Sequence, residues 1–89
     1  MPKQSKTEQN TDLLPAHSRM ARAALQWGVR DLAAAAEVSH DTVVRFERGE
    51  ELRSRTVAAI RTTLEKAGVV FIPENGGGAG VRLRKRRRR

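Results

Sequence analysis

The sequence predicts a mostly α-helical domain of four to five helices, followed by a C-terminal β-hairpin and a basic tail. Apolar residues recur at helical spacing between residues 15 and 68. From Val69 to Ile72 the residues are β-branched and aromatic, as in a strand, and the chain ends in a basic run. We therefore expect an N-terminal arm at residues 1–14, a helical domain at 15–68, a hairpin at 69–84 and a tail at 85–89.

Length and composition limit the possible functions. The 89 residues allow one small domain, and with two Phe, one Trp and no Tyr the core must use Ala, Val, Leu and Ile. The absence of cysteine excludes disulfides, zinc fingers and thiol catalysis. The sequence has no nucleophile beside a base, no phosphate-binding loop and no metal-ligand cluster, so we expect neither an enzyme nor a cofactor. No apolar run has the length of a membrane span, so a cytoplasmic protein is expected.

The net charge of +8 is unevenly distributed. Residues 1–81 carry 11 basic and 10 acidic groups. The other seven of the 18 basic residues are Arg82, Arg84, Lys85, Arg86, Arg87, Arg88 and Arg89. The overall basicity is therefore evidence about the tail, and the function of the helical part must be inferred from its residue pattern.

The first expected helix begins at Pro15, because a proline in the first turn needs no N–H. The polar residues before it are expected to form a mobile arm. Arg19 and Arg22 are expected to point outward. The expected inner face consists of Ala21, Ala24 and Leu25. Trp27, at the joint with the next helix, is interpreted as a core residue, because a tryptophan buries a large area.

Residues 29–48 have the clearest pattern in the chain. Their apolar spacing of i, i+3, i+4 and i+7 predicts a short helix with one buried face. The residues of this stripe are Val29, Leu32, Ala33 and Ala36. Gly28 and Asp31 suit the start of this helix, Ser39 suits the start of a second one, and Gly49 suits its end. Two short helices are therefore expected to cross at a steep angle.

On the second helix, Val43 and Phe46 are three residues apart and are expected to point into the angle between the two helices. The opposite side carries residues that packing does not require: His40, Asp41, Val44, Arg45 and Arg48. Together they offer hydrogen-bond donors, an acceptor and a methyl contact, which are the groups that recognise base edges in a major groove.

These two helices and the segments beside them resemble the helix-turn-helix of the Xre (Cro/C1-type) family, over roughly residues 15 to 85. The resemblance rests on Leu32, Ala33, Ala36, Val38, Val43 and Phe46. One departure from the family is Glu37, at a position where the family often has glycine. A left-handed turn at this position is less natural for glutamate than for glycine. The resemblance implies that double-stranded DNA is the partner and that the second helix lies in the major groove.

Each residue of the outer face then has an expected role. Arg45 is the candidate for a guanine, since a guanidinium can donate to both O6 and N7. Asp41 either holds Arg45 in position, accepts from a cytosine, or forms a simple surface ion pair. His40 is a base or phosphate contact or a solvated residue, and Val44 offers an apolar contact. The expected phosphate contacts are Arg30, Ser39, Arg48, Arg53, Arg55, Lys85, Arg86, Arg87, Arg88 and Arg89.

The last helix is expected to start after Ser54 as the N-cap and to end at Gly68. Its expected buried stripe is Val57, Ile60, Leu64 and Ala67. Its expected solvated face is Arg55, Arg61, Glu65 and Lys66. The following hairpin is marginal alone, so it either lies on the helical core or pairs with a second copy, as in a homodimer.

Together these patterns favour a sequence-specific DNA-binding transcriptional regulator, nucleoid-associated and homodimeric, whose recognition helix spans His40 to Arg48. The alternative is a protein-interaction module on the same scaffold, such as an antitoxin or an RNA polymerase adaptor, with a protein as partner.

Overall fold

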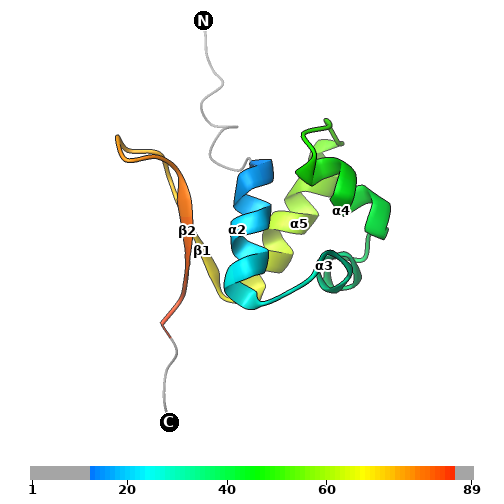
Figure 1. Ribbon diagram of the computed structural model, residues 1–89, viewed down its shortest axis with the longest axis horizontal. Helices are drawn as coiled ribbons and strands as arrows, with labels where there is room; N and C mark the ends of the chain where they lie inside the picture. The colour runs from blue at the N-terminus through cyan, green and yellow to red at the C-terminus, as the bar shows by residue number, and fades with distance from the viewer. Residues whose placement is uncertain (1–12, 86–89) are drawn as a thin grey trace, which may run out of the picture.

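Four helices and one β-hairpin make up residues 13–85, the part of the chain that the computed structural model describes. The elements are α2 (Pro15–Leu25), α3 (Val29–Ala36), α4 (His40–Glu47), α5 (Ser54–Lys66), β1 (Val69–Ile72) and β2 (Gly80–Leu83). The expected mostly helical fold with a hairpin after the helices is thus confirmed for these residues (Figure 1). None of the helices in this range is both long and apolar enough to cross a membrane.

Local chemistry explains where the helices begin. Pro15 is the first residue of α2, as expected. The Asp31 carboxylate accepts the Gly28 N–H at 2.7 Å, and the Ser39 hydroxyl accepts the Thr42 N–H at 3.0 Å, so both predicted N-termini are confirmed. The predicted N-cap at Ser54 is wrong by one residue, because helical geometry already begins there and the preceding residue is the cap.

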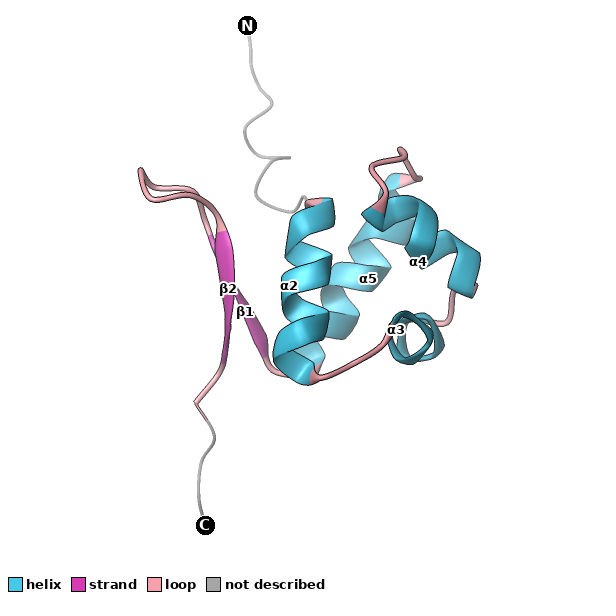
Figure 2. Cartoon of the chain, in the orientation of Figure 1, coloured by secondary structure: helices cyan, strands magenta, loops and turns pink. Residues whose placement is uncertain are grey.

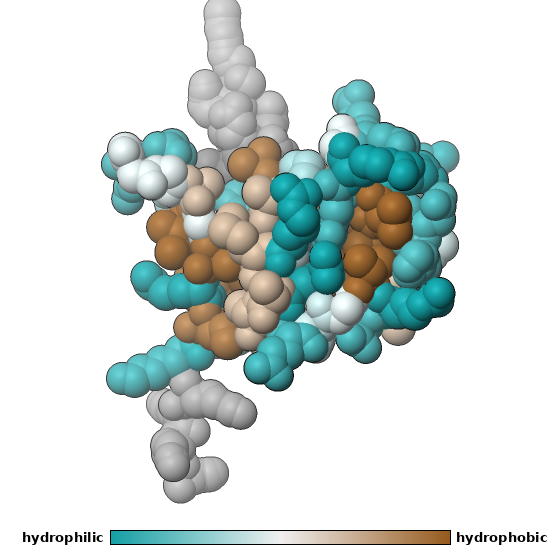
Figure 3. Space-filling view, viewed as in Figure 1, coloured by the Kyte–Doolittle hydropathy of each residue, from teal (hydrophilic) through white to brown (hydrophobic). Residues whose placement is uncertain are grey.

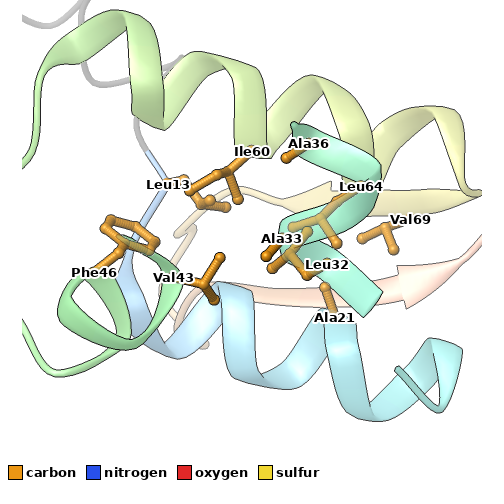
Figure 4. Close-up of a cluster of buried hydrophobic side chains, with 10 residues drawn as sticks. All are labelled: Leu13, Ala21, Leu32, Ala33, Ala36, Val43, Phe46, Ile60, Leu64 and Val69. Atoms are coloured by element: carbon orange, nitrogen blue, oxygen red, sulfur yellow. The ribbon is translucent and has the colours of Figure 1, made fainter. Parts of the chain in front are cut away.

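The core lies where the four helices meet the first strand, and Figure 4 shows side chains from each of them pointing into it. It consists of Leu13, Ala21, Leu32, Ala33, Ala36, Val43, Phe46, Ile60, Leu64 and Val69. Three of the ten are alanines, so the helices approach closely and each contact buries little area. Trp27 is half-buried and packs against the edge of this core. Leu13 is only 4% exposed, so the chain joins the core before the predicted end of the arm at residue 14.

The inner face of α2 differs from the prediction. Ala24 is exposed, whereas Ser18 is fully buried and Arg22 is half-buried and turned toward α4. The buried stripe therefore follows Ser18, Ala21, Arg22 and Leu25, which again has the spacing i, i+3, i+4 and i+7. An apolar-only pattern missed it, because two of its members are polar.

The C-terminal half of α5 also differs in detail. Ala67 is exposed and does not continue the buried stripe of Ile60 and Leu64. Arg61 does not belong to a solvated face. Its guanidinium lies 4.5 Å from the centre of the Phe71 ring and also donates to Glu65 at 3.1 Å.

The hairpin lies against the helices, with β2 beside α2 and β1 beside α5 (Figures 1 and 2). Val69 pairs with Leu83 and Phe71 pairs with Val81 in an antiparallel register, so these four residues share one face. Val69, Phe71 and Val81 of this face pack into the core, which is the first of the two arrangements expected for the hairpin. Within the described residues each strand still has one unpaired edge.

Candidate nucleic-acid interface

The position of α4 is determined by side chains on one of its faces. Val43 is fully buried and Phe46 is 5% exposed, and both contact the core beside Leu32 and Ala33 of α3. Figure 1 shows α3 almost end-on while α4 runs across the view, so the two helices cross steeply as expected. Packing of one face leaves the other face of α4 at the molecular surface.

The turn between α3 and α4 contains Glu37 in the left-handed conformation, with a φ of 61°. The Val38 N–H donates to the Ala33 carbonyl at 3.0 Å and the Glu37 N–H donates to the Ala34 carbonyl at 3.2 Å. These two bonds form a Schellman motif, which needs a left-handed residue where the helix ends. The turn therefore forms although a glutamate occupies the position that suits glycine.

Four charged side chains meet on the outer face of α4 and the loop after it. Arg45 donates from Nη1 to Asp41 Oδ2 at 3.3 Å and from Nε to Glu50 Oε1 at 3.2 Å. Arg48 donates from Nη2 to the other oxygen of Glu50, at 3.0 Å. The hydrogen bonds that Arg45 donates to Asp41 and Glu50 raise the pKa of its guanidinium. Asp41 therefore pairs with Arg45 across one helical turn at an exposed position, whereas the participation of Glu50 was not predicted.

A second cluster fixes the C-terminal end of α4 to α2. The Glu47 carboxylate, 8% exposed, accepts from Ser18 Oγ at 2.6 Å and from Nε and Nη2 of Arg22 at 2.9 and 2.7 Å. Burial alone would raise the pKa of Glu47, but the bonds from Arg22 and Ser18 outweigh it and hold the pKa below its usual value. The outward orientation predicted for Arg22 is wrong, because this side chain is the main partner of Glu47.

Both clusters left a signal in the sequence. Glu47 follows Val43 and Phe46 at the spacing of one helical face, so its carboxylate lies on the buried side of the helix. A buried charge needs an ionic or hydrogen-bond partner. Glu50 left a weaker signal. It follows Gly49, which ends the helix, and a residue at that position is held close to the last helical turn.

The other predicted contact residues differ in their surroundings. His40 is exposed at the start of α4, and Val44 is half-buried. The hydroxyl of Ser39 caps α4 and also lies 2.7 Å from the hydroxyl of Thr42. Of the basic residues predicted to contact phosphates, four are exposed and form no ion pair with another described residue: Arg30, Arg53, Arg55 and Lys85. The predicted contacts Arg86, Arg87, Arg88 and Arg89 lie outside the described residues.

Within residues 13–85, no three His, Asp or Glu side chains are grouped so that they could hold a metal ion. No protein-family model matches the chain, and no curated protein matches it in sequence. Function is therefore inferred from α4 and the residues around it.

Proposed function

We propose that this protein is a sequence-specific DNA-binding transcriptional regulator, similar to the Xre family, that recognises the major groove with α4. The observation that supports this function is the division of α4 into two faces. Val43, Phe46 and Glu47 attach the helix to the rest of the protein. The opposite face offers a histidine, a carboxylate, a methyl-bearing side chain and a guanidinium to a partner. A major groove about 12 Å wide admits such a helix.

Within this proposal, the residues of α4 have different roles. Arg45 lies in the last turn and can donate two parallel hydrogen bonds to a guanine. The exposed His40 and Asp41 and the half-buried Val44 lie on the same side of the helix and contact neighbouring base edges. The predicted phosphate contacts outside α4 that the structure describes, together with Arg48, set the register without distinguishing sequences: Arg30, Ser39, Arg53, Arg55 and Lys85.

We also propose that the protein binds DNA as a homodimer, since a single short recognition helix contacts few base pairs. Figure 3 shows apolar side chains gathered over α2 and the hairpin. Leu83 at the end of β2 is 45% exposed, although it shares a sheet face with residues of the core. A second copy placed by two-fold symmetry would cover this residue and would present two α4 helices to two half-sites.

The test begins with selection of binding sites from randomised DNA at a stated near-physiological salt concentration. Affinities of the wild type and of Arg45→Ala are then measured for the selected site and for random DNA. Without the bidentate guanine hydrogen bonds, binding to the selected site should weaken by about 1–3 kcal/mol and binding to random DNA only slightly. Lys66→Ala is the matched control, because it removes one exposed positive charge at the far end of α5.

Two results would contradict the proposal. If Arg45→Ala weakens binding equally on both DNAs, Arg45 is a phosphate contact and does not discriminate between sequences. If selection enriches no site and random competitor removes all bound DNA, α4 is not a recognition helix, and the protein-interaction module becomes the better hypothesis.

A further inference from the structure

We propose that Glu50 is a specificity-determining residue, whose carboxylate competes with DNA phosphates for Arg45 and Arg48. This inference rests on the proposed DNA-binding function and adds to it a residue that suppresses binding to random sequence. The groups involved are one carboxylate and two guanidinium groups, all at the surface that α4 would turn toward DNA.

The backbone holds Glu50 firmly against α4. Its N–H donates to the carbonyl of Arg45 at 3.0 Å, and the N–H of Gly49 donates to the carbonyl of Phe46 at 3.0 Å. These are the two bonds of a Schellman motif, and Gly49 has the positive φ of 101° that the motif requires. Glu50 is therefore a fixed extension of the helix end, and its carboxylate is directed back along the face of α4.

The carboxylate of Glu50 joins both arginines at once. Oε1 accepts from Arg45 Nε at 3.2 Å, and Oε2 accepts from Arg48 Nη2 at 3.0 Å. Asp41 takes a further donor of Arg45 at 3.3 Å. The cluster thus has two positive and two negative charges, so the face that would meet DNA has no net attraction for phosphates from these four residues.

Competition affects the two kinds of DNA differently. On random DNA, a phosphate that binds Arg45 or Arg48 must replace the carboxylate or share the guanidinium with it. Such a contact therefore gains less than a contact to a free arginine, and the carboxylate repels the phosphates beside it. On a preferred site, Arg45 forms two directed hydrogen bonds to guanine, which the carboxylate cannot supply to DNA. Non-specific affinity comes almost entirely from phosphate neutralisation, so the competition reduces it more.

The experiment compares Glu50→Gln with Glu51→Gln in the full chain, on random DNA and on the selected site. Each variant removes one negative charge from the same loop, but Glu51 forms no ion pair with a described residue. Glu50→Gln should bind random DNA about 1.5- to fivefold more tightly, which is the range of a surface ion pair, and should show less preference for the selected site. Its salt dependence on random DNA should become steeper by about 0.9 for each additional phosphate that the variant neutralises. Glu51→Gln should change both affinities slightly and equally.

Equal effects of the two variants on random DNA would overturn the inference, because net charge alone would then explain them. Weaker binding of Glu50→Gln to the selected site without tighter binding to random DNA would also overturn it, and would make Glu50 a positioning residue for Arg45. Thermal unfolding of both variants checks that the fold is intact. A wild type that prefers no sequence contradicts the proposed function. In that case, the comparison on random DNA still tests the competition, so the two failures are distinguishable.

Discussion

Glu37 has a strained backbone conformation that a single substitution can relieve. It is exposed and has a φ of 61°, a region in which a side chain clashes with its own backbone. Glu37→Gly should raise the free energy of unfolding by about 0.5–1 kcal/mol, because glycine adopts this conformation without strain. The measurement is chemical denaturation. Glu37→Gln is the control, since it removes the same charge but keeps the side chain, and equal stability of the two variants would contradict the prediction.

His17 makes stability depend on pH. The side chain is 7% exposed, its Nδ1 accepts the Leu14 N–H at 3.1 Å, and its Nε2 is buried without a partner among the described residues. The ring also meets the Phe71 ring edge-on, at 5.5 Å between centroids. Burial, and secondly the charge of Arg61, lower the pKa of His17. Protonation would also remove the acceptor that caps α2.

The sign follows from the lowered pKa. The unfolded chain binds a proton more readily than the folded one, so the contribution of His17 is complete above the ordinary histidine pKa of about 6.5 and is lost as the pH falls below it. The melting temperature should therefore drop between about pH 7 and pH 5, near that ordinary pKa. His17→Gln should flatten this dependence, whereas His40→Gln, at an exposed position, should keep it. A wild type with constant stability over this range would refute the assignment.

The elements show which parts of the fold the sequence could predict. Helix ends were predictable from Pro15, Gly28, Ser39 and Gly49, because caps depend on local chemistry. Most of the core positions on α3 and α4 followed from apolar spacing. The contact between Arg22 and Glu47 did not follow from apolar spacing. It joins residues 25 positions apart, and polar residues interrupt the buried stripes of both α2 and α4.

The same reasoning applies to the candidate site. The exposed row on α4 was predictable, since it is what remains once Val43 and Phe46 are placed in the core. The ionic contacts of Glu50 were not predictable from the sequence, because they depend on the direction in which the chain leaves α4 after Gly49. Sequence periodicity therefore identified the helix face but not the groups that compete for its arginines.

The contact between α2 and α4 should depend strongly on charge balance. Arg22→Ala leaves the nearly buried Glu47 carboxylate without its main partner and should lower the free energy of unfolding by about 2–4 kcal/mol. Arg48→Ala breaks an ion pair whose arginine is 61% exposed and should cost at most about 1 kcal/mol, so it is a suitable control. Urea denaturation measures the free energy of unfolding of both variants.

The double variant Arg22→Met with Glu47→Met should be more stable than Arg22→Ala, because it leaves no buried charge. A double variant that is less stable would show that the hydrogen bonds of Ser18 and Arg22 contribute more than the cost of burying the charge. Because the pKa of Glu47 is lowered, the wild type should also lose this contribution in acid, below the ordinary glutamate range, and hence at lower pH than the effect of His17.

For the whole molecule, the proposed dimer can be tested without removing the hairpin. Deleting it would take Val69, which is 2% exposed, out of the core, so a loss of dimer could then result from a damaged fold. Leu83→Gln instead changes an exposed side chain and should shift the monomer–dimer equilibrium toward monomer in analytical ultracentrifugation. Leu14→Gln, also exposed but at the opposite end of α2, is the control. A wild type that stays monomeric at high concentration, alone and on DNA, would contradict the proposal.

The distribution of charge over the whole chain makes a prediction about the basic tail. Lys85 and the four arginines after it are five of the 18 basic residues, and Arg86–Arg89 lie outside the described residues. Under the proposed DNA-binding function, most of the non-specific attraction to DNA should come from other basic groups, because Arg45 and Arg48 are already paired to carboxylates. Neutralising phosphates releases counterions whatever the sequence, so the tail should add affinity without discrimination.

Truncation after Arg84 should therefore reduce the slope of log affinity against log salt, by about 0.9 for each phosphate that the shortened chain no longer neutralises. The preference for the selected site over random DNA should stay unchanged. Replacing Arg86–Arg89 by lysines is the control, because it keeps the charge and removes only the guanidinium geometry. This variant should retain the wild-type slope. An unchanged slope after truncation would mean that the tail does not contact the duplex. A reduced site preference in the lysine variant would mean that its arginines recognise a groove, and α4 would then share sequence recognition with the tail.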